Sequence, residues 1–299
     1  MRIAALDIGG TAIKHGIWDG MGLLGFGQCG SVAAEGAQAL MGQVEEVLRG
    51  MQPFDAIGVS TAGEVDTRMG TICGANRNIP GYLGLDVAAA LRGAFGVPVA
   101  VENDANAAAV GELSYGAMRG TSDFIYVTYG TGVGGAVVMD GRLRHGSGFS
   151  AGSFGGIVVH PERLDACDLL AGRYESYAST SALVRRAQRV DPAIDSGLAA
   201  FAAKDDPAVR AELRAWAHEV AIGLVSLVYA FSPEAVVLGG GVMQQPGLVE
   251  AVAREAKGLA DPRFEGVSIV RSDLGSRAGV LGAAHLAQRL LRGVADQGR

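Results

Sequence analysis

Basic residues, cysteines and long apolar runs are all scarce in this chain of 299 residues. Its 25 Lys and Arg stand against 31 Asp and Glu, and the formal net charge of −6 argues against a nucleic-acid binder. The three cysteines, Cys29, Cys73 and Cys167, form no CxxC pair, so we expect a reducing, cytoplasmic compartment and no disulfide scaffold. The most apolar stretch, 220–231, is too short to span a bilayer and predicts a buried helix, so no membrane partner is expected.

Apolar residues and glycine, in contrast, are abundant. The hydrophobic fraction of 49% rules out global disorder, and the length favours about two domains. The 46 glycines are about twice the usual share, yet they show no collagen-like period and stand beside only 9 prolines. This glycine content predicts tight turns and places where two stretches of backbone approach closely.

The apolar pattern predicts two α/β domains that open in the same way. Strand-like runs at 3–8 and 13–18 flank one glycine turn, and runs at 124–129 and 134–139 flank another. No low-complexity linker separates the halves, so we expect a hinge between them. Further expected elements are strands at 56–60, 97–101 and 235–238 and helices at 37–48, 86–95 (capped by Asp86), 106–115, 179–190, 207–231 and 278–291.

The first glycine turn, Gly9-Gly10-Thr11, follows an acidic residue at a strand end. Glycines let backbone N–H groups approach a phosphate closely, and Thr11 adds a hydroxyl donor. Asp7 is placed to hold Mg²⁺, usually through water, because this ion gives up its water reluctantly. An ordinary β-hairpin with a glycine turn explains the same residues, and the segment alone does not choose between the two.

The second glycine turn, Gly130-Thr131-Gly132, lies in a formal GxGxxG pattern. A dinucleotide site needs a helix after this pattern, whereas a strand is predicted here, so NAD binding is rejected. Two such turns, one in each half, suggest a nucleotide held between duplicated domains. Gly239-Gly240-Gly241, after a later strand, would let the backbone lie against a purine, although a tight strand-to-helix turn explains it equally well.

Asp104 is the candidate general base. It stands in the segment Glu102-Asn103-Asp104, at the end of a predicted strand that leads into an alanine-rich helix. A carboxylate at an exposed strand end can face a cleft. Sequence position alone favours the plainer interpretation that Asp104 merely caps the N-terminus of the helix.

Together these segments resemble the ROK family of sugar kinases, in the actin-like, hexokinase-like ATPase superfamily. The resemblance covers nearly the whole chain and implies a duplicated, two-domain α/β fold, ribonuclease H-like, with the ligand cleft between the domains. We expect a smaller domain at 1–115, a larger one at 116–285, and a last helix at 286–299 that returns to the first. The matching motifs are Asp7 to Thr11, Glu102 to Asn106, Thr128 to Gly135, Ala151-Gly152, Gly172 to Glu175 and Gly239 to Gly241.

The resemblance implies ATP- and Mg²⁺-dependent phosphorylation of a sugar hydroxyl, at C6 of a hexose, an N-acylated hexosamine or a β-glucoside. Asp104 matches the family's catalytic base, Asp7 would meet Mg²⁺ through water, and a homodimer is expected. The expected sugar-binding residues are Asn103, Glu175, Ser153, Gly63 and Asn78. The expected ATP- and phosphate-binding residues are Asp7, Gly9, Gly10, Thr11, Lys14, Thr128, Gly130, Thr131, Gly132, Gly240 and Gly241.

The chain departs from the family pattern at two places. Ser153 and Gly156 stand where many relatives have a Glu and a His that contact the sugar, so we expect room for a substituted hexose. The family's zinc segment has three cysteines, but only Cys167 is present before Glu175. One cysteine and His160 cannot supply four zinc ligands, so no structural zinc is expected, as in some relatives that include β-glucoside kinases.

Two other functions are weighed against the kinase. A ROK-type transcriptional repressor would need a helix-turn-helix of several dozen residues before Asp7, and there is no room for one. A non-catalytic sugar or nucleotide sensor of the same fold stays open as the alternative, although the retained Asp7, Asn103, Asp104 and Glu175 count against it. His145 lies in a loop near the expected sugar site and is a weak candidate for a ligand contact.

Overall fold

The computed structural model describes residues 1–74 and 79–293, and the chain forms two compact units. The first unit comprises Met1–Gly120, Arg142–Ala151 and the chain from Ser276 onward, and the second comprises Thr121–Gly141 and Gly152–Gly275. These bounds differ from the expected division at two places. The segment 142–151 belongs to the first unit, and so does the whole last helix. Among the described residues, no helix is long and apolar enough to cross a membrane.

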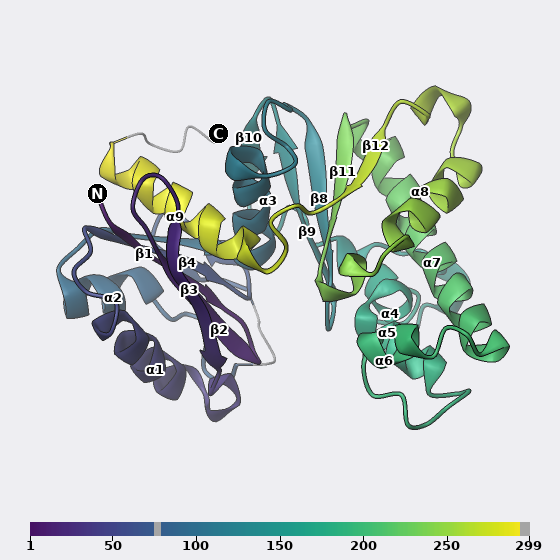
Figure 1. Ribbon diagram of the computed structural model, residues 1–299, viewed down its shortest axis with the longest axis horizontal. Coiled ribbons are helices and arrows are strands. Elements are labelled where there is room, and N and C mark those ends of the chain that lie inside the picture. Colours follow the sequence, from purple (N-terminus) through teal and green to yellow (C-terminus); the bar gives the residue numbers. More distant parts are fainter. Residues whose placement is uncertain (75–78, 294–299) are drawn as a thin grey trace. The chain divides into compact units, whose positions relative to one another are not determined.

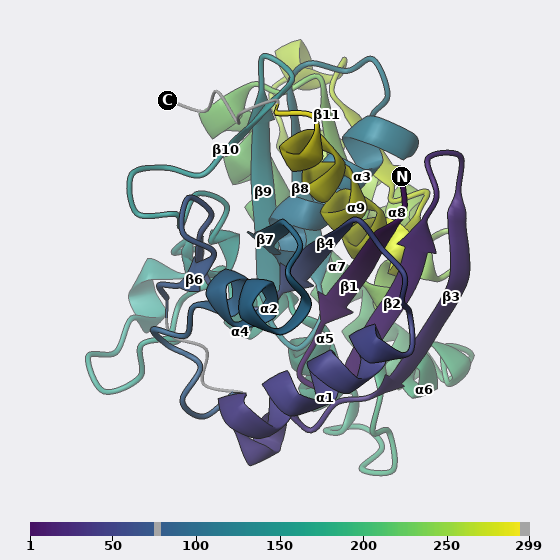
Figure 2. The ribbon, with the colours of Figure 1, turned by 90° about the vertical axis from the view of Figure 1, so that its left-hand side faces the viewer.

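The first unit is a five-stranded sheet with helices on both faces (Figure 2). The strand order is β3-β2-β1-β4-β7, in which β1 is antiparallel to β2 and parallel to β4. Side chains alternate between the faces. Leu6 and Ile57 join α1 and α2 in one hydrophobic core, whereas Asp7 and Gly58 face α9. The bounds are β1 Ile3–Ile8, β2 Ala12–Trp18, β3 Leu23–Gly30, β4 Ala56–Thr61, β5 Val65–Asp66, β6 Thr71–Ile72, β7 Val99–Asn103, β10 Arg142–Arg144, α1 Ala37–Arg49, α2 Val87–Phe95, α3 Asp104–Tyr115 and α9 Ala278–Leu291.

Small residues let α9 pack directly against α3 and the sheet. Gly282 of α9 faces the carbonyl of Ala107 in α3, and a Cβ there would overlap the oxygen. Gly58 of β4 faces the carbonyl of Ala283 in the same way. These contacts account for part of the glycine content, because no larger residue fits where backbone meets backbone.

In the sheet of the second unit, neighbouring strands lie in the order β9-β8-β11-β12 (Figure 1). Strand β8 is antiparallel to β9 and parallel to β11, and β11 is parallel to β12. The long helix α7 packs against the shorter helices α4, α5 and α8. The bounds are β8 Phe124–Tyr129, β9 Val133–Met139, β11 Ala235–Gly239, β12 Ser268–Arg271, α4 Tyr174–Ala178, α5 Thr180–Ala187, α6 Gly197–Ala202, α7 Pro207–Phe231 and α8 Leu248–Leu259.

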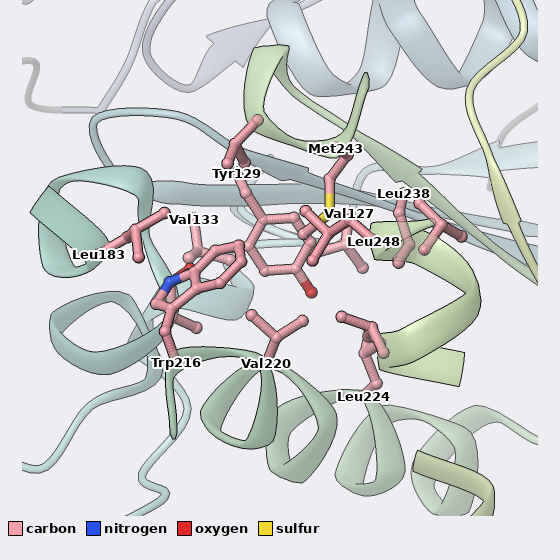
Figure 3. Close-up of a cluster of buried hydrophobic side chains, with 14 of the residues drawn as sticks. Val127, Tyr129, Val133, Leu183, Trp216, Val220, Leu224, Leu238, Met243 and Leu248 are labelled. Atoms are coloured by element: carbon pink, nitrogen blue, oxygen red, sulfur yellow. The ribbon is translucent and has the colours of Figure 1, made fainter. Parts of the chain in front are cut away.

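Buried aromatic side chains fix the carboxyl end of β8 in this unit (Figure 3). The Tyr129 hydroxyl is 2.8 Å from the hydroxyl of Tyr174, which in turn donates to the Val220 carbonyl (2.7 Å). The Trp216 indole N–H donates to the carbonyl of Ala178 at 3.0 Å. Since each of these three buried polar groups has a partner, the strand end that precedes the second glycine turn is held in one arrangement.

The expected elements are confirmed with shifted bounds. The helices predicted at 207–231 and 278–291 coincide with α7 and α9, and Asp86 caps α2 by accepting a hydrogen bond from the Ala89 N–H (2.7 Å). The bounds predicted for the strand at 97–101 were two residues too early. Strand β7 begins after Pro98, which has no N–H to donate. The helix predicted at 106–115 begins at Asp104 instead.

Candidate active site

A row of three polar side chains crosses the sheet of the first unit at the end of β1. Asp7 pairs in register with Lys14 on β2 and with Ser60 on β4. Its Oδ2 accepts a hydrogen bond from Lys14 Nζ (2.8 Å), and its Oδ1 accepts one from Ser60 Oγ (2.7 Å). We call these three residues the carboxylate row. Each oxygen of Asp7 is thereby oriented by a neighbouring strand.

Helix α9 packs directly against the carboxylate row. A Cβ on Gly279, in the first turn of α9, would stand 3.0 Å from both Oδ1 of Asp7 and Oγ of Ser60. That distance is shorter than ordinary van der Waals contact, so glycine is the residue that fits without a shift. Sequence reasoning missed both Ser60 and Gly279. The register of parallel strands could have indicated Ser60, whereas nothing local distinguishes Gly279 from other helical glycines.

The first glycine turn follows the row directly. The Gly9 N–H donates to the Ala12 carbonyl (3.0 Å), which closes a tight turn between β1 and β2. Gly10 and Thr11 at its tip are exposed. The turn therefore presents backbone to solvent beside a fixed carboxylate, as a phosphate site requires.

Asn103, and not Asp104, caps helix α3, so the simple capping interpretation of Asp104 was wrong. The Oδ1 of Asn103 accepts hydrogen bonds from the N–H groups of Ala105 (3.0 Å) and Asn106 (3.2 Å). Its Nδ2 donates to the Gly63 carbonyl (2.9 Å) and to Oδ1 of Asp104 (3.0 Å). The amide of Asn103 thus orients the carboxylate that follows it.

Two opposing influences act on the pKa of Asp104. Burial among surrounding groups and, after it, the negative charge of Asp7 raise this pKa from 3.8 to about 6. Hydrogen bonds from Ala105 and Asn103 and the charge of Lys14 lower it but are outweighed. The residue nevertheless keeps exposed surface. Asp104 is therefore a reachable carboxylate whose pKa lies closer to neutrality than that of an ordinary Asp, which suits a general base.

In the second unit, the second glycine turn is tied to two helices. The Gly130 carbonyl accepts a hydrogen bond from the Thr180 N–H (2.9 Å), at the start of α5. The Val133 N–H, at the start of β9, donates to Oε2 of Glu175 in α4 (3.0 Å). Gly130 and Thr131 are exposed, and Thr128 is half-buried. Thr180 was not predicted, and Glu175 has a contact to this turn that the sequence did not suggest.

Gly240 has a conformation that requires glycine. Its φ of 98° lies in the left-handed region, and a Cβ would overlap the Tyr129 carbonyl. Gly241 beside it is exposed. The glycine run therefore brings backbone against the end of β8, next to the second glycine turn.

The remaining predicted sugar residues are distributed over both units. Gly63 has a φ of 99° and supplies the carbonyl that holds Asn103. Ser153 is exposed and precedes a short 3₁₀ turn, Phe154–Gly156. A Cβ on Gly156 would meet nothing within 4 Å. Asn78 lies outside the described residues.

The region expected to lack zinc contains His160 and Cys167. The Nε2 of His160 is 2.8 Å from Oε2 of Glu219, and Cys167 is exposed. Within residues 1–74 and 79–293, no three His, Cys, Asp or Glu side chains gather in a group that could hold a metal ion. The absence of zinc stays a prediction for metal analysis.

Comparison with known proteins agrees with this geometry. The ROK family model matches residues 3–290. The beta-glucoside kinase of Listeria innocua is 30% identical, over 95% of this chain and 97% of that protein, and the glucokinase of Streptomyces coelicolor is 32% identical, over 95% and 96%. A solved ROK family glucokinase from Streptomyces griseus, in complex with glucose and AMPPNP, has a TM-score of 0.85 and 29% identity over 97% of this chain and 100% of that one. The chain belongs to the ROK family, as one of its ATP-dependent sugar kinases with the two-domain, actin-like ATPase fold.

Proposed function

We propose that this kinase transfers the γ-phosphoryl group of ATP to the C6 hydroxyl of a hexose, an N-acylated hexosamine or a β-glucoside, with Asp104 as general base. The observation that carries the proposal is the state of Asp104. Asp104 keeps exposed surface, its carboxylate is oriented by Asn103, and its pKa is raised to about 6. At neutral pH it is ionised and still basic enough to take a proton from a polarised hydroxyl.

The proposed step is an in-line displacement. Asp104 accepts the hydroxyl proton as the sugar oxygen forms a bond to the γ-phosphorus, and the bond from that phosphorus to the β–γ bridging oxygen breaks. ADP leaves with the electron pair of the broken bond. The first glycine turn supplies backbone donors for phosphate oxygens, on which negative charge is concentrated.

The residues of the carboxylate row fit a hydrated Mg²⁺. Each Asp7 oxygen accepts one hydrogen bond in the structure, from Lys14 or from Ser60, and keeps a lone pair for a metal-bound water. When bound, the ion neutralises charge on the phosphates. Lys14 adds a further positive charge beside Asp7.

The substrate class follows from Ser153 and Gly156. Both residues are exposed, and space is open around the Cα of Gly156. A pocket without the family's Glu and His loses hydrogen bonds to sugar hydroxyls, each worth about 0.5–1.5 kcal/mol when neutral. The freed volume suits a substituent on the C1 to C3 side, such as a β-linked group or an N-acyl group. The relatives named beta-glucoside kinase and putative N-acetylmannosamine kinase support this range of substrates.

A coupled assay of ADP release across a panel of sugars tests the proposal. The panel contains glucose, mannose, allose, fructose, N-acetylmannosamine, cellobiose and simple β-glucosides, with a reaction lacking sugar as the control. We expect a higher kcat/KM for a substituted hexose or disaccharide than for glucose, and phosphorus–carbon coupling at C6 in the product NMR spectrum. ADP release that no sugar accelerates would favour the sensor alternative.

A paired variant tests the pocket argument separately. Ser153→Glu combined with Gly156→His restores the family's residue types, and the open space at 156 accommodates the imidazole. We expect this variant to gain kcat/KM for glucose and to lose it for the substituted sugar. If glucose is already the best substrate of the unaltered protein, the enlarged-pocket argument is wrong. A homodimer and a cytoplasmic location are further expectations. Mass measurement by sedimentation would check the first, and cell fractionation would check the second.

A further inference from the structure

A buried carboxylate lies immediately before the turn that carries the proposed base. The side chain of Glu102 is 3% exposed. Its Oε1 accepts hydrogen bonds from the Asn103 N–H (2.8 Å) and from Asn106 Nδ2 (3.0 Å). Glu102 therefore holds both Asn103, which orients Asp104, and Asn106 in the first turn of α3.

The other oxygen of Glu102 is held by a residue from a distant part of the chain. The Nε2 of His145 is 2.7 Å from Oε2 of Glu102, and the His145 side chain is 12% exposed. Both residues belong to the first unit. A carboxylate this well buried is costly unless it is fully paired, so the contact with His145 supports the whole arrangement.

The loop around His145 is itself anchored. The His145 carbonyl accepts a hydrogen bond from the Ala151 N–H (3.0 Å), which closes the loop. The ring of Phe149 lies 6.4 Å from the His145 ring, and the Arg68 guanidinium lies 4.9 Å from the Phe149 ring centroid. The imidazole is thus presented to Glu102 by a packed loop and is not a freely rotating surface side chain.

We propose that His145 is a positioning residue for phosphoryl transfer, which acts through Glu102 on the Asn103–Asp104 turn. The chain of contacts runs from His145 to Glu102, from Glu102 to the Asn103 N–H, and from the Asn103 amide to Oδ1 of Asp104. The inference rests on the proposed role of Asp104 as general base. Loss of the imidazole leaves a buried charge that must find another partner, and the turn shifts with it.

The space beside His145 permits a sharp test. His145 and Glu102 both line a cavity of about 1320 Å³, bounded also by β7 and the end of α9. A small molecule from solvent can therefore reach the place of the missing ring in a His145→Ala variant. In His145→Leu, a side chain of similar bulk without a donor occupies that place, so it serves as the matched control. His145→Gln offers an amide N–H to Glu102 and is the conservative variant.

We expect kcat to fall about 10- to 100-fold in both His145→Ala and His145→Leu, because small displacements of catalytic groups have effects of this size. KM for ATP should change little, since both glycine turns are untouched. Added imidazole should restore a large part of kcat in His145→Ala, none in His145→Leu, and should not change the unaltered enzyme. His145→Gln should keep most of the activity. Unchanged kcat in His145→Leu, or equal losses in kcat and stability that imidazole does not reverse, would overturn the proposal.

A second measurement separates this inference from the proposed function. Hydrogen exchange of the backbone amides in 99–108 reports on the turn without any turnover, and it should be faster in His145→Leu than in His145→Gln. If Asp104→Asn is fully active while exchange behaves as expected, the role of Asp104 is wrong but the structural link stands. If Asp104→Asn is inactive while both kcat and exchange of His145→Leu match the unaltered protein, only the link is refuted.

Discussion

Replacing Asp104 by Asn should inactivate the enzyme and stabilise it at the same time. The amide keeps the shape of the side chain, and its oxygen can accept the hydrogen bonds that Asn103 Nδ2 and the Ala105 N–H now donate to the carboxylate. It cannot accept the substrate proton. General-base loss costs about 10²–10⁴-fold in rate, so kcat should fall by that factor while ATP still binds.

The stability effect follows from the pKa of Asp104, which is raised from 3.8 to about 6 in the folded protein. Between these two values the folded state binds more protons than the unfolded state, so stability falls as pH rises through this window. A shift of this size corresponds to about 3 kcal/mol for a fully shielded group. Because Asp104 keeps exposed surface, solvent screening reduces the expected cost at pH 7.5 to about 1–2 kcal/mol.

Urea unfolding of both proteins at two pH values tests this reasoning. At pH 7.5 Asp104→Asn should be more stable by about 1–2 kcal/mol, and at pH 4.5 the gain should shrink to about a third of that value. The kcat/KM of the unaltered enzyme should rise with pH and level off above about 6, as Asp104 loses its proton. A gain that is the same at both pH values, or a destabilised variant at pH 7.5, would refute the raised pKa.

Three further predictions concern other parts of the molecule. Gly279→Ala should cost about 1–3 kcal/mol in urea unfolding, because its Cβ presses on the carboxylate row, whereas Gly93→Ala in α2, where a Cβ meets nothing within 4 Å, should be neutral or stabilising. Glu175→Ala should raise KM for ATP, because the Val133 N–H loses its acceptor, and Glu175→Gln should largely preserve it; an effect confined to KM for the sugar would instead indicate direct sugar contact. Elemental analysis of protein purified without added metal should find far less than one zinc per chain, and stoichiometric zinc would contradict that expectation.

Sequence reasoning indicated the parts of the candidate site that are local in the chain. Asp7 and the first glycine turn stand in one strand–turn–strand, and Asp104 stands at a strand end, so pattern and residue type were enough to indicate them. The sequence could not decide between base and cap for Asp104, because Asn103 offers the same capping chemistry one residue earlier. In the structure, two N–H groups point to Asn103 Oδ1, so Asn103 is the cap, and the base role of Asp104 stays a prediction.

The contacts that sequence reasoning missed join distant segments of the chain. Ser60 meets Asp7 only because β1 and β4 pair in a particular parallel register, and a slip of one residue would turn it to the other face. His145 meets Glu102 across 43 positions, whereas the sequence indicated it only as a weak candidate for a ligand contact. Glu175 was selected by family resemblance, which is silent on its bond to the second glycine turn. Tertiary packing, and not local preference, places each of these side chains.

Helix α9 links the stability of the first unit to the chemistry of its carboxylates. Burial and, after it, the charge of Asp7 raise the pKa of Asp104, so holding the two side chains near one another disfavours the folded state at neutral pH. The last helix supplies the opposing burial, since Val280 is fully buried and Leu281 nearly so. Each such side chain contributes about 1.5–3 kcal/mol, which together exceeds the cost assigned to Asp104. Because Gly279 places this helix directly behind Asp7, the same element that offsets the electrostatic cost also fixes the carboxylate that causes part of it.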